Sequence, residues 1–169
     1  GDPVVDIEYH LIRSDRRSIG IEVDREGKVT VRAPYSCEKK RIERFLLEKE
    51  NWIRQKVKLQ KKNAMKRLEQ AFNYIDDHYC EKITLEEVAS SVYMSSNYFS
   101  SYFRKVTNIS FSDYVTRMRI NHARELLRET DKNVTEIAME CGFNNISNFY
   151  RLYKKHVGKP PKDEKQKKQ

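Results

Sequence analysis

The sequence lacks the features of a disulfide-stapled, secreted or membrane-spanning protein. Its three cysteines, Cys37, Cys80 and Cys141, are an odd number, lie far apart and form no C-x-x-C pair, so we expect reduced thiols. No apolar stretch approaches the roughly 18 residues of a membrane span, and no charged-then-apolar leader opens the chain. We therefore expect a soluble cytoplasmic protein.

Acidic residues are scarce relative to basic ones. The 169 residues include 34 Lys and Arg against 25 Asp and Glu, a formal net charge of +9. Such a balance favours an anionic partner, nucleic acid or a membrane surface, with a solvated basic surface as the alternative. Hydrophobic residues make up 38% of the chain, which is enough for a packed core.

Residues 1–60 predict a small β-β-β-α module. Three short runs alternate apolar and polar residues, and turn residues 24–27 precede the third run, so we expect a three-stranded antiparallel sheet that ends in a hairpin. A helix capped by Ser36 follows Pro34 and covers one sheet face. The apolar residues expected to point inward are Val5, Ile7, Tyr9, Ile19, Ile21, Val29 and Val31 of the strands and Ile42, Phe45, Leu46, Trp52, Ile53 and Val57 of the helix.

This segment resembles the opening part of the YgjP-like metal-dependent hydrolases, through IRSDRRSIGIEVDREGKVTVRAP and RIERFLLEKENWIRQK. That family's zinc chemistry depends on a His-Glu-x-x-His helix, which this chain lacks, since its four His are isolated. The resemblance therefore implies a related fold without catalysis, cofactor or metal site. Binding to nucleic acid, dimerisation and plain solvation stay open for the module's basic residues Arg13, Arg16, Arg17 and Arg32.

A helix-turn-helix pattern follows the module. Met65, Leu68, Phe72, Ile75 and Tyr79 step at helical spacing, and Gln60 to Asn63 contain no Gly or Pro, so the boundary is a continuous helix or a short break. A short helix over 85–92 is then capped by Thr84, with Glu87 completing a capping box. Ser95 or Ser96 caps a second helix. Between them Tyr93 occupies the turn position where Gly is usual, at some cost if its φ is positive.

The same pattern recurs. Residues 134–138 repeat 85–89 after 49 residues, and 148–155 repeat 98–105, with Gly142 in the second turn and one extra residue before the last helix. An internal repeat is a stronger signal than one match. The segment 111–130 between the copies has helical spacing, and roughly 19 residues make a rod of about 28 Å. Such a rod can set two helices into major-groove segments that recur about every 34 Å.

Residues 65–159 resemble the DNA-binding domain of the AraC/XylS transcription regulators. The resemblance is carried by ITLEEVASSVYMSSNYFSSYFRKVTNISFSDYVTRMRINHARELL and VTEIAMECGFNNISNFYRLYKKHVGKPP. It implies that two recognition helices enter successive major grooves. The residues expected to read bases are Asn97, Ser100 and Ser101 in the first helix and Ile146, Ser147, Asn148, Tyr150 and Arg151 in the second; those expected to contact phosphates are Ser95, Arg104, Lys105, Lys154 and Lys155.

The sequence thus predicts an α+β module over 1–60, an all-α domain with two helix-turn-helix motifs joined by a long helix over 64–161, and a charged, disordered tail over 162–169. We expect a sequence-specific transcription regulator associated with the nucleoid, without enzymatic activity. Double-stranded DNA is the expected partner and RNA polymerase a further candidate. We expect a monomer, with a dimer as the alternative. The competing functions are a hydrolase-derived module and a protein-interaction module with a secondary DNA-binding role.

Overall fold

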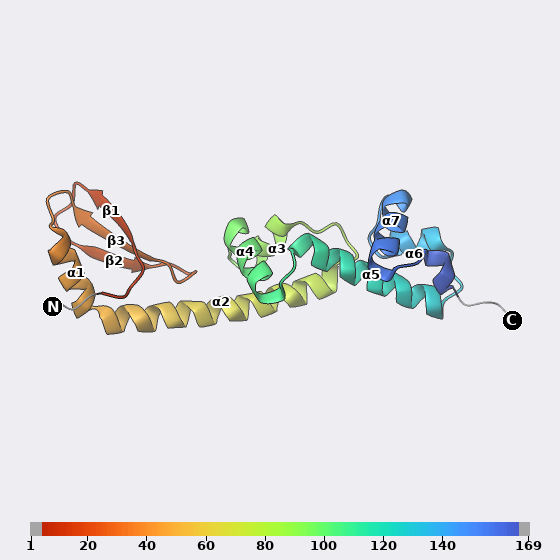
Figure 1. Cartoon of the computed structure of the whole chain (residues 1–169), viewed down its shortest axis with the longest axis horizontal. Helices are drawn as coiled ribbons and strands as arrows, with labels where there is room; N and C mark the ends of the chain where they lie inside the picture. Colours follow the sequence, from red (N-terminus) through yellow and green to blue (C-terminus); the bar gives the residue numbers. More distant parts are fainter. Residues whose placement is uncertain (1–4, 166–169) are drawn as a thin grey trace. The chain divides into compact units, whose positions relative to one another are not determined.

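The structure, a computed structural model, describes residues 5–165. The chain divides into two compact units, unit 1 within Gly1–Arg67 and unit 2 within Leu68–Gln169. Figure 1 shows that unit 1 holds the strands and unit 2 is helical. The helix α2 (Glu50–His78) contributes residues to both units. Among residues 5–165, none of the helices is both long and apolar enough to cross a membrane.

The sheet of unit 1 is mixed, so the expectation of an all-antiparallel sheet is wrong. Its strands are β1 (His10–Ser14), β2 (Gly20–Val23) and β3 (Val29–Pro34), in the order β1-β3-β2. The β2–β3 hairpin is antiparallel as predicted, whereas β1 pairs with β3 in parallel, with His10 opposite Thr30. Side chains alternate identically in parallel and antiparallel strands, so the residue pattern could not distinguish the two pairings.

The connection from β1 to β2 explains how the parallel pair forms. Because β3 lies between β1 and β2, the connection must cross two strand spacings, a distance of roughly 9.6 Å. The five residues 15–19 between these strands are long enough. The central strand β3 is also the most buried, with Val31 and Ala33 fully inaccessible. The residues of the predicted strands that were expected to point inward all pack on one core, whereas Glu8, His10 and Glu22 are exposed. The first of these inward residues, Val5, Ile7 and Tyr9, precede β1, which begins only at His10.

The helix of unit 1 is broken, unlike the single helix expected. The first part, α1 (Lys39–Glu48), has Glu38 rather than Ser36 at its N-cap position, and Lys49 (φ −101°, ψ 7°) separates it from α2. Ile42, Leu46 and Ile53 are buried as predicted. Trp52 was expected to point inward, but 49% of it is exposed, because the break sets a new buried face on α2 that begins at Ile53. Across 60–63 the helix is continuous.

Unit 2 contains two helix-turn-helix motifs. The first pairs α3 (Leu85–Ser91) with α4 (Ser96–Thr107), and the second pairs α6 (Val134–Glu140) with α7 (Ile146–Val157). Between them, α5 (Phe111–Glu129) contacts α4, α6 and α7. Phe72 of α2, Phe103 of α4 and Tyr114 of α5 form an aromatic cluster in the first motif.

The core of the second motif is closed by α5. Ile120, Ala123 and Leu127 of α5 pack with buried residues of α6 and α7.

The end of the chain is also ordered beyond the expected boundary. Residues Pro161–Glu164 form the 3-10 helix η1, in which Glu164 is buried, where the sequence suggested a disordered tail. Residues 166–169 of that tail lie outside the described residues.

Candidate nucleic-acid interface

The first helices of the two motifs are built alike. Thr84 and Asn133 are their N-caps, 49 residues apart, and their side chains accept hydrogen bonds from the backbone N–H groups of Glu87 and Glu136. Such caps satisfy N–H groups that a helix start leaves without partners. The predicted cap at Thr84 is therefore confirmed.

The turns of the two motifs also match. The N–H of Met94 donates to the carbonyl of Ala89, and the N–H of Phe143 donates to that of Ala138, at 2.9 Å in both cases. After this point the spacing between equivalent residues becomes 50, since the N-caps Ser95 and Asn145 begin the next helices. The extra residue predicted in the second turn is therefore Asn144.

The two turns meet the same backbone requirement with different residues. Tyr93 has φ +57° and Gly142 has φ +101°, so the positive φ suspected at Tyr93 is real. A Cβ on Gly142 would lie 2.9 Å from the backbone oxygen of Cys80 and 2.9 Å from Nε of Arg119. Gly142 is thus required by both its conformation and its close contacts, whereas the Tyr93 side chain is 73% exposed.

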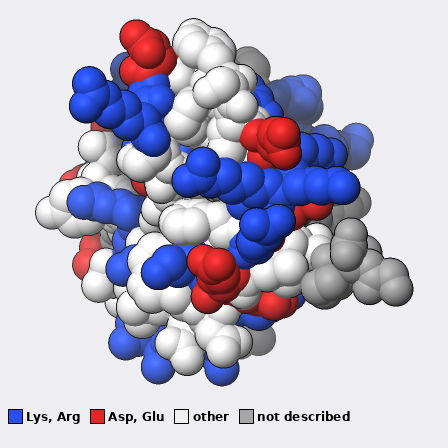
Figure 2. All heavy atoms as spheres, turned by 90° about the vertical axis from the view of Figure 1, so that its left-hand side faces the viewer, with Lys and Arg blue, Asp and Glu red and all other residues white. Residues whose placement is uncertain are grey.

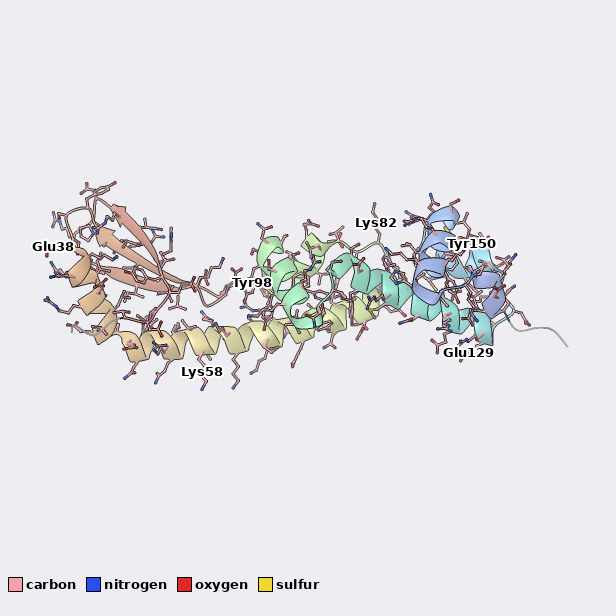
Figure 3. All side chains as sticks on the ribbon, in the orientation of Figure 1. Glu38, Lys58, Lys82, Tyr98, Glu129 and Tyr150 are labelled. Atoms are coloured by element: carbon pink, nitrogen blue, oxygen red, sulfur yellow. The ribbon has the colours of Figure 1, made fainter. Side chains whose placement is uncertain are left out.

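Every residue expected to read bases is exposed on α4 or α7. The buried side of each helix carries the aromatic residues Phe99 and Phe103 in α4 and Phe149 and Tyr153 in α7. Figure 3 shows Tyr150 on α7. The exposed residues are Asn97, Ser100 and Ser101 on α4 and Ile146, Ser147, Asn148, Tyr150 and Arg151 on α7. The face expected to meet DNA is therefore separated from the core.

Asn148 and Arg151 form a pair on the exposed face of α7. The Arg151 guanidinium donates a hydrogen bond of 2.6 Å to the side-chain oxygen of Asn148. This contact uses one guanidinium N–H group and the Asn148 oxygen, so the other guanidinium N–H groups and the Asn148 NH₂ remain as potential donors. Asparagine pairs best with adenine and arginine with guanine in the major groove. The hydrogen bond therefore holds next to each other two side chains that were predicted to read bases.

The residues expected to contact phosphates are exposed as well. They are Ser95, Arg104, Lys105, Lys154 and Lys155. The Ser95 side chain caps α4 by accepting from the N–H of Tyr98. The four cations lie in the last turns of α4 and α7, where positive charge is favoured by the helix dipole. None of the ion pairs recorded among residues 5–165 uses any of these four cations.

Arg119 is a positioning residue that the sequence did not reveal. From α5 it donates to the backbone oxygens of Tyr79, at 2.5 Å, and Glu81, at 2.7 Å. It thereby fixes the segment before α3 against the turn of the second motif.

The buried Cys141 begins that turn, and burial raises the pKa of its thiol to about 12, so the thiol is neutral at pH 7. Cys37, Cys80 and Cys141 are all free.

A second missed feature anchors the chain end. The buried carboxylate of Glu164 accepts hydrogen bonds from Arg124 at 2.7 Å and Arg128 at 2.9 Å, and Lys159 lies 3.4 Å away. Burial raises the pKa of this carboxyl, but the three cations outweigh it and hold the pKa below its usual range. Arg124, Arg128 and Lys159 are 40, 36 and 5 residues distant from Glu164 in sequence, so the fold is what brings the two arginines to this carboxylate.

Two of the four histidines lie beside a glutamate. In the part of the chain that the structure describes, no group of three or more His, Cys, Asp or Glu is arranged to hold a metal ion. His78 pairs with Glu81, and His122 lies 4.0 Å from Glu125. The absence of zinc from the protein stays a prediction.

Comparison with known proteins finds relatives of the second unit. A family profile described as "Helix-turn-helix domain" matches residues 88–167. The Melibiose operon regulatory protein of Escherichia coli K12 is 38% identical over 92 residues, which cover 54% of this chain and 30% of that protein. The chain thus spans about a third of the length of the curated relatives that it matches.

Solved structures extend the similarity to the fold. The C-terminal domain of the response regulator yesN from Fusobacterium nucleatum is 31% identical, with a TM-score of 0.55, over 58% of this chain and 96% of that one. An AraC-type regulator from Chromobacterium violaceum is 26% identical, with a TM-score of 0.56, over 60% of this chain and 90% of that one. The DNA-binding domain of AdpA, solved in complex with a target DNA, is 26% identical, with a TM-score of 0.54, over 56% of this chain and 85% of that one.

The profile match lies within unit 2, so the resemblance of unit 1 to YgjP-like hydrolases stays a prediction. The matched residues 88–167 extend from the first motif of unit 2 through the second, and the solved structures share the fold of this unit. Through its second unit, this chain is similar in sequence and in fold to AraC-type helix-turn-helix DNA-binding domains.

Proposed function

We propose that this chain is a sequence-specific transcription regulator that reads duplex DNA with α4 and α7. One observation carries the proposal: all the residues assigned to base reading are exposed, while the aromatic residues of the same helices are buried. Each helix therefore presents one polar face, and a major groove admits one α-helix.

The residues have distinct roles in this proposal. Arg151 and Asn148 supply the strongest base contacts, and Asn97 offers a second amide reader. Ser100, Ser101 and Ser147 are weaker, more permissive readers, and Ile146 and Tyr150 contribute apolar contacts. The cations at the ends of α4 and α7, with Ser95, position the DNA backbone. α5, at about 28 Å for its 19 residues, sets the two helices into successive grooves.

Regulation follows from occupancy of the site. A protein bound beside a promoter changes transcription by recruiting or by blocking RNA polymerase. We propose no catalytic role and no cofactor, since the exposed side chains that carry the proposal are donors and acceptors for base edges. The protein then acts at the nucleoid.

The test is selection of bound sequences from a random duplex pool, with full-length protein. We expect enrichment of two short elements separated by about one helical turn of DNA, one for each recognition helix. Affinity for the enriched duplex should fall steeply with salt, because several phosphates are neutralised. Failure to enrich any sequence at low salt would overturn the proposal.

A further inference from the structure

Residues 51–67 of α2 carry positive charge without any negative charge. Between Glu50 and Glu69 the chain holds seven basic residues and no Asp or Glu. Exposed helices normally interleave opposite charges as i,i+4 pairs, and like charges at that spacing destabilise a helix. A polyanionic partner offsets this repulsion. The seven residues are Arg54, Lys56, Lys58, Lys61, Lys62, Lys66 and Arg67.

Five of these residues form a continuous row on one side of α2, here called the basic row: Arg54, Lys58, Lys61, Lys62 and Lys66. At 3.6 residues per turn they fall within an arc of about 140°, and all five are exposed. Ile53, Ala64 and Leu68 are buried on a neighbouring face. Figure 3 shows Lys58 projecting from the helix.

Within residues 5–165, the four lysines of the basic row form no ion pair with an acidic residue. None of the ion pairs recorded among residues 5–165 includes Lys58, Lys61, Lys62 or Lys66. Arg54 differs, because it pairs with Glu50 at 3.0 Å and donates to the backbone oxygen of Asp6 at 3.0 Å. The lysine charges of the row are therefore available to a partner.

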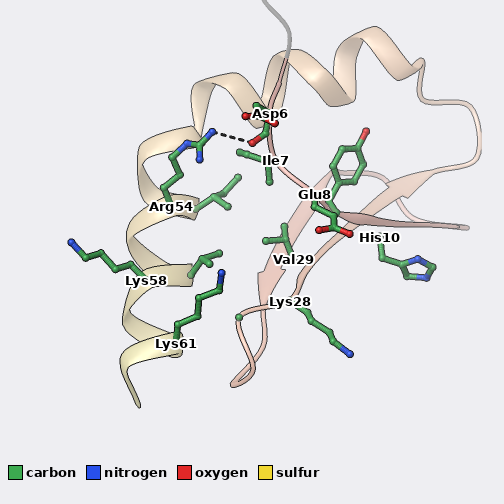
Figure 4. Close-up of a pocket in the computed structure, with 13 residues that line it drawn as sticks. Asp6, Ile7, Glu8, His10, Lys28, Val29, Arg54, Lys58 and Lys61 are labelled. Atoms are coloured by element: carbon green, nitrogen blue, oxygen red, sulfur yellow. Dashed lines mark hydrogen bonds between the residues drawn. The ribbon is translucent and has the colours of Figure 1, made fainter. Parts of the chain in front are cut away.

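Part of the basic row borders a groove of about 880 Å³ in unit 1. Figure 4 shows Lys61 pointing into the space between α2 and the strands, whereas Lys58 points outward. A Cβ on Gly27 would lie 3.4 Å from Cγ of Lys61, so the Lys61 stem packs on the turn between β2 and β3. Asp6 and Glu8 line the groove as well. These carboxylates disfavour an acidic peptide inside the groove.

The shape of the basic row fits a rod-like polyanion. From Arg54 to Lys66 the helix rises about 18 Å, which corresponds to roughly five phosphates along one DNA strand. On the face of the chain drawn in Figure 2, Lys and Arg side chains gather in groups with isolated carboxylates between them. Straight, exposed and unpaired lysines match a phosphate backbone better than a folded acidic protein.

We propose that the basic row binds the phosphate backbone of DNA beside the site that unit 2 occupies. This inference rests on the proposed function of unit 2. The two units are consecutive parts of one chain. When unit 2 is bound to DNA, the DNA is therefore present at a high effective concentration near the basic row. The contacts add affinity and lengthen the protected DNA without reading its sequence.

The test compares full-length protein with the variant Lys58→Gln, Lys61→Gln, Lys62→Gln. The matched control, Lys39→Gln, Lys40→Gln, Lys49→Gln, removes equal charge from exposed positions of the same unit where Glu38, Glu43 and Glu48 are interspersed. Binding is measured against salt, on the selected site with short flanks and with flanks longer by one helical turn or more on each side. Circular dichroism checks that each variant keeps its helix content.

We expect wild type and the control to bind the long duplex more tightly than the short one. The row variant should lose this preference, and its salt slope on the long duplex should be shallower by about 0.9 for each lost phosphate contact, or about 2.7 in total. An unchanged slope and flank preference in a folded row variant would overturn the inference while leaving the proposed function intact. Failure of wild type to bind either duplex would instead reject the proposed function, and this inference with it.

Discussion

Arg151 and Lys155 lie one helical turn apart on α7, yet they are assigned to different parts of the DNA. Arg151→Ala should relax preference at one base position and cost about 1–3 kcal/mol there, because a bidentate contact to guanine is lost. Lys155→Ala should weaken all duplexes about equally. Binding to a panel of single-base site variants measures both. If both substitutions lower affinity without altering preference, the assignment of α7 is wrong.

Tyr93 and Gly142 occupy equivalent turn positions, so they form a matched pair for substitution. Tyr93→Gly should stabilise the protein by about 0.5 kcal/mol, since relief of the left-handed conformation outweighs the added entropy of glycine in the unfolded chain. Gly142→Ala should destabilise it by about 2 kcal/mol or more, because the new Cβ meets the Cys80 backbone at 2.9 Å. Denaturant unfolding measures both changes, and equal effects at the two turns would contradict this account.

Among the elements, η1 depends on one carboxylate. Glu164→Gln should destabilise unit 2 by about 2 kcal/mol, because Arg124 and Arg128 lose a charged acceptor. The folded pKa of Glu164 lies below its unfolded value of about 4.3. Its stabilising contribution is therefore present above about pH 4.3 and is lost as pH falls through the folded pKa.

The pH dependence distinguishes this ion cluster from simple packing. Thermal unfolding between about pH 7 and pH 3 should show a wild-type advantage over Glu164→Gln that shrinks in acid. Asp163→Asn, at the exposed neighbour, serves as the control and should change little. An advantage that persists undiminished at pH 3 would assign the effect to side-chain packing.

For the whole molecule, the first prediction concerns which part binds DNA. Residues 64–169 alone should bind the selected duplex, because both motifs and α5 lie within them. Their affinity should retain the base preference of the full chain, since the assigned readers are all in unit 2. Electrophoretic mobility shift with single-base site variants checks this. A fragment that is helical by circular dichroism but binds no duplex at low salt would contradict the prediction.

The oligomeric state is the second property of the whole molecule. The sheet face away from the core carries the exposed residues His10 and Glu22, a polar surface that disfavours an obligate hydrophobic dimer. Two motifs on one chain can also occupy two grooves without a partner. Light scattering at micromolar concentration should give a mass near 20.2 kDa. Twice that mass would identify unit 1 as an oligomerisation module.

The sequence alone determined the parts of the molecule that depend on local, repeated patterns. These parts follow from residue type and helical spacing: the cap at Thr84, the turn at Gly142, the extra residue of the second turn, and the division of α4 and α7 into buried and exposed faces. For the cap of α4 the sequence left Ser95 and Ser96 open, and the structure selects Ser95. These features act within a few residues of chain, so a single sequence contains the information they require.

Only the tertiary structure decided the features that join residues far apart in the chain. It placed β1 beside β3 in parallel, broke the helix at Lys49 so that Trp52 faces outward, and brought Glu164 to Arg124 and Arg128. Strand alternation is the same for either pairing direction, and the energy of a buried carboxylate depends on partners that local sequence does not reveal. The strand pairing, the helix break and the partners of Glu164 depend on contacts between residues far apart in the chain, and the energy of these contacts can exceed local preferences.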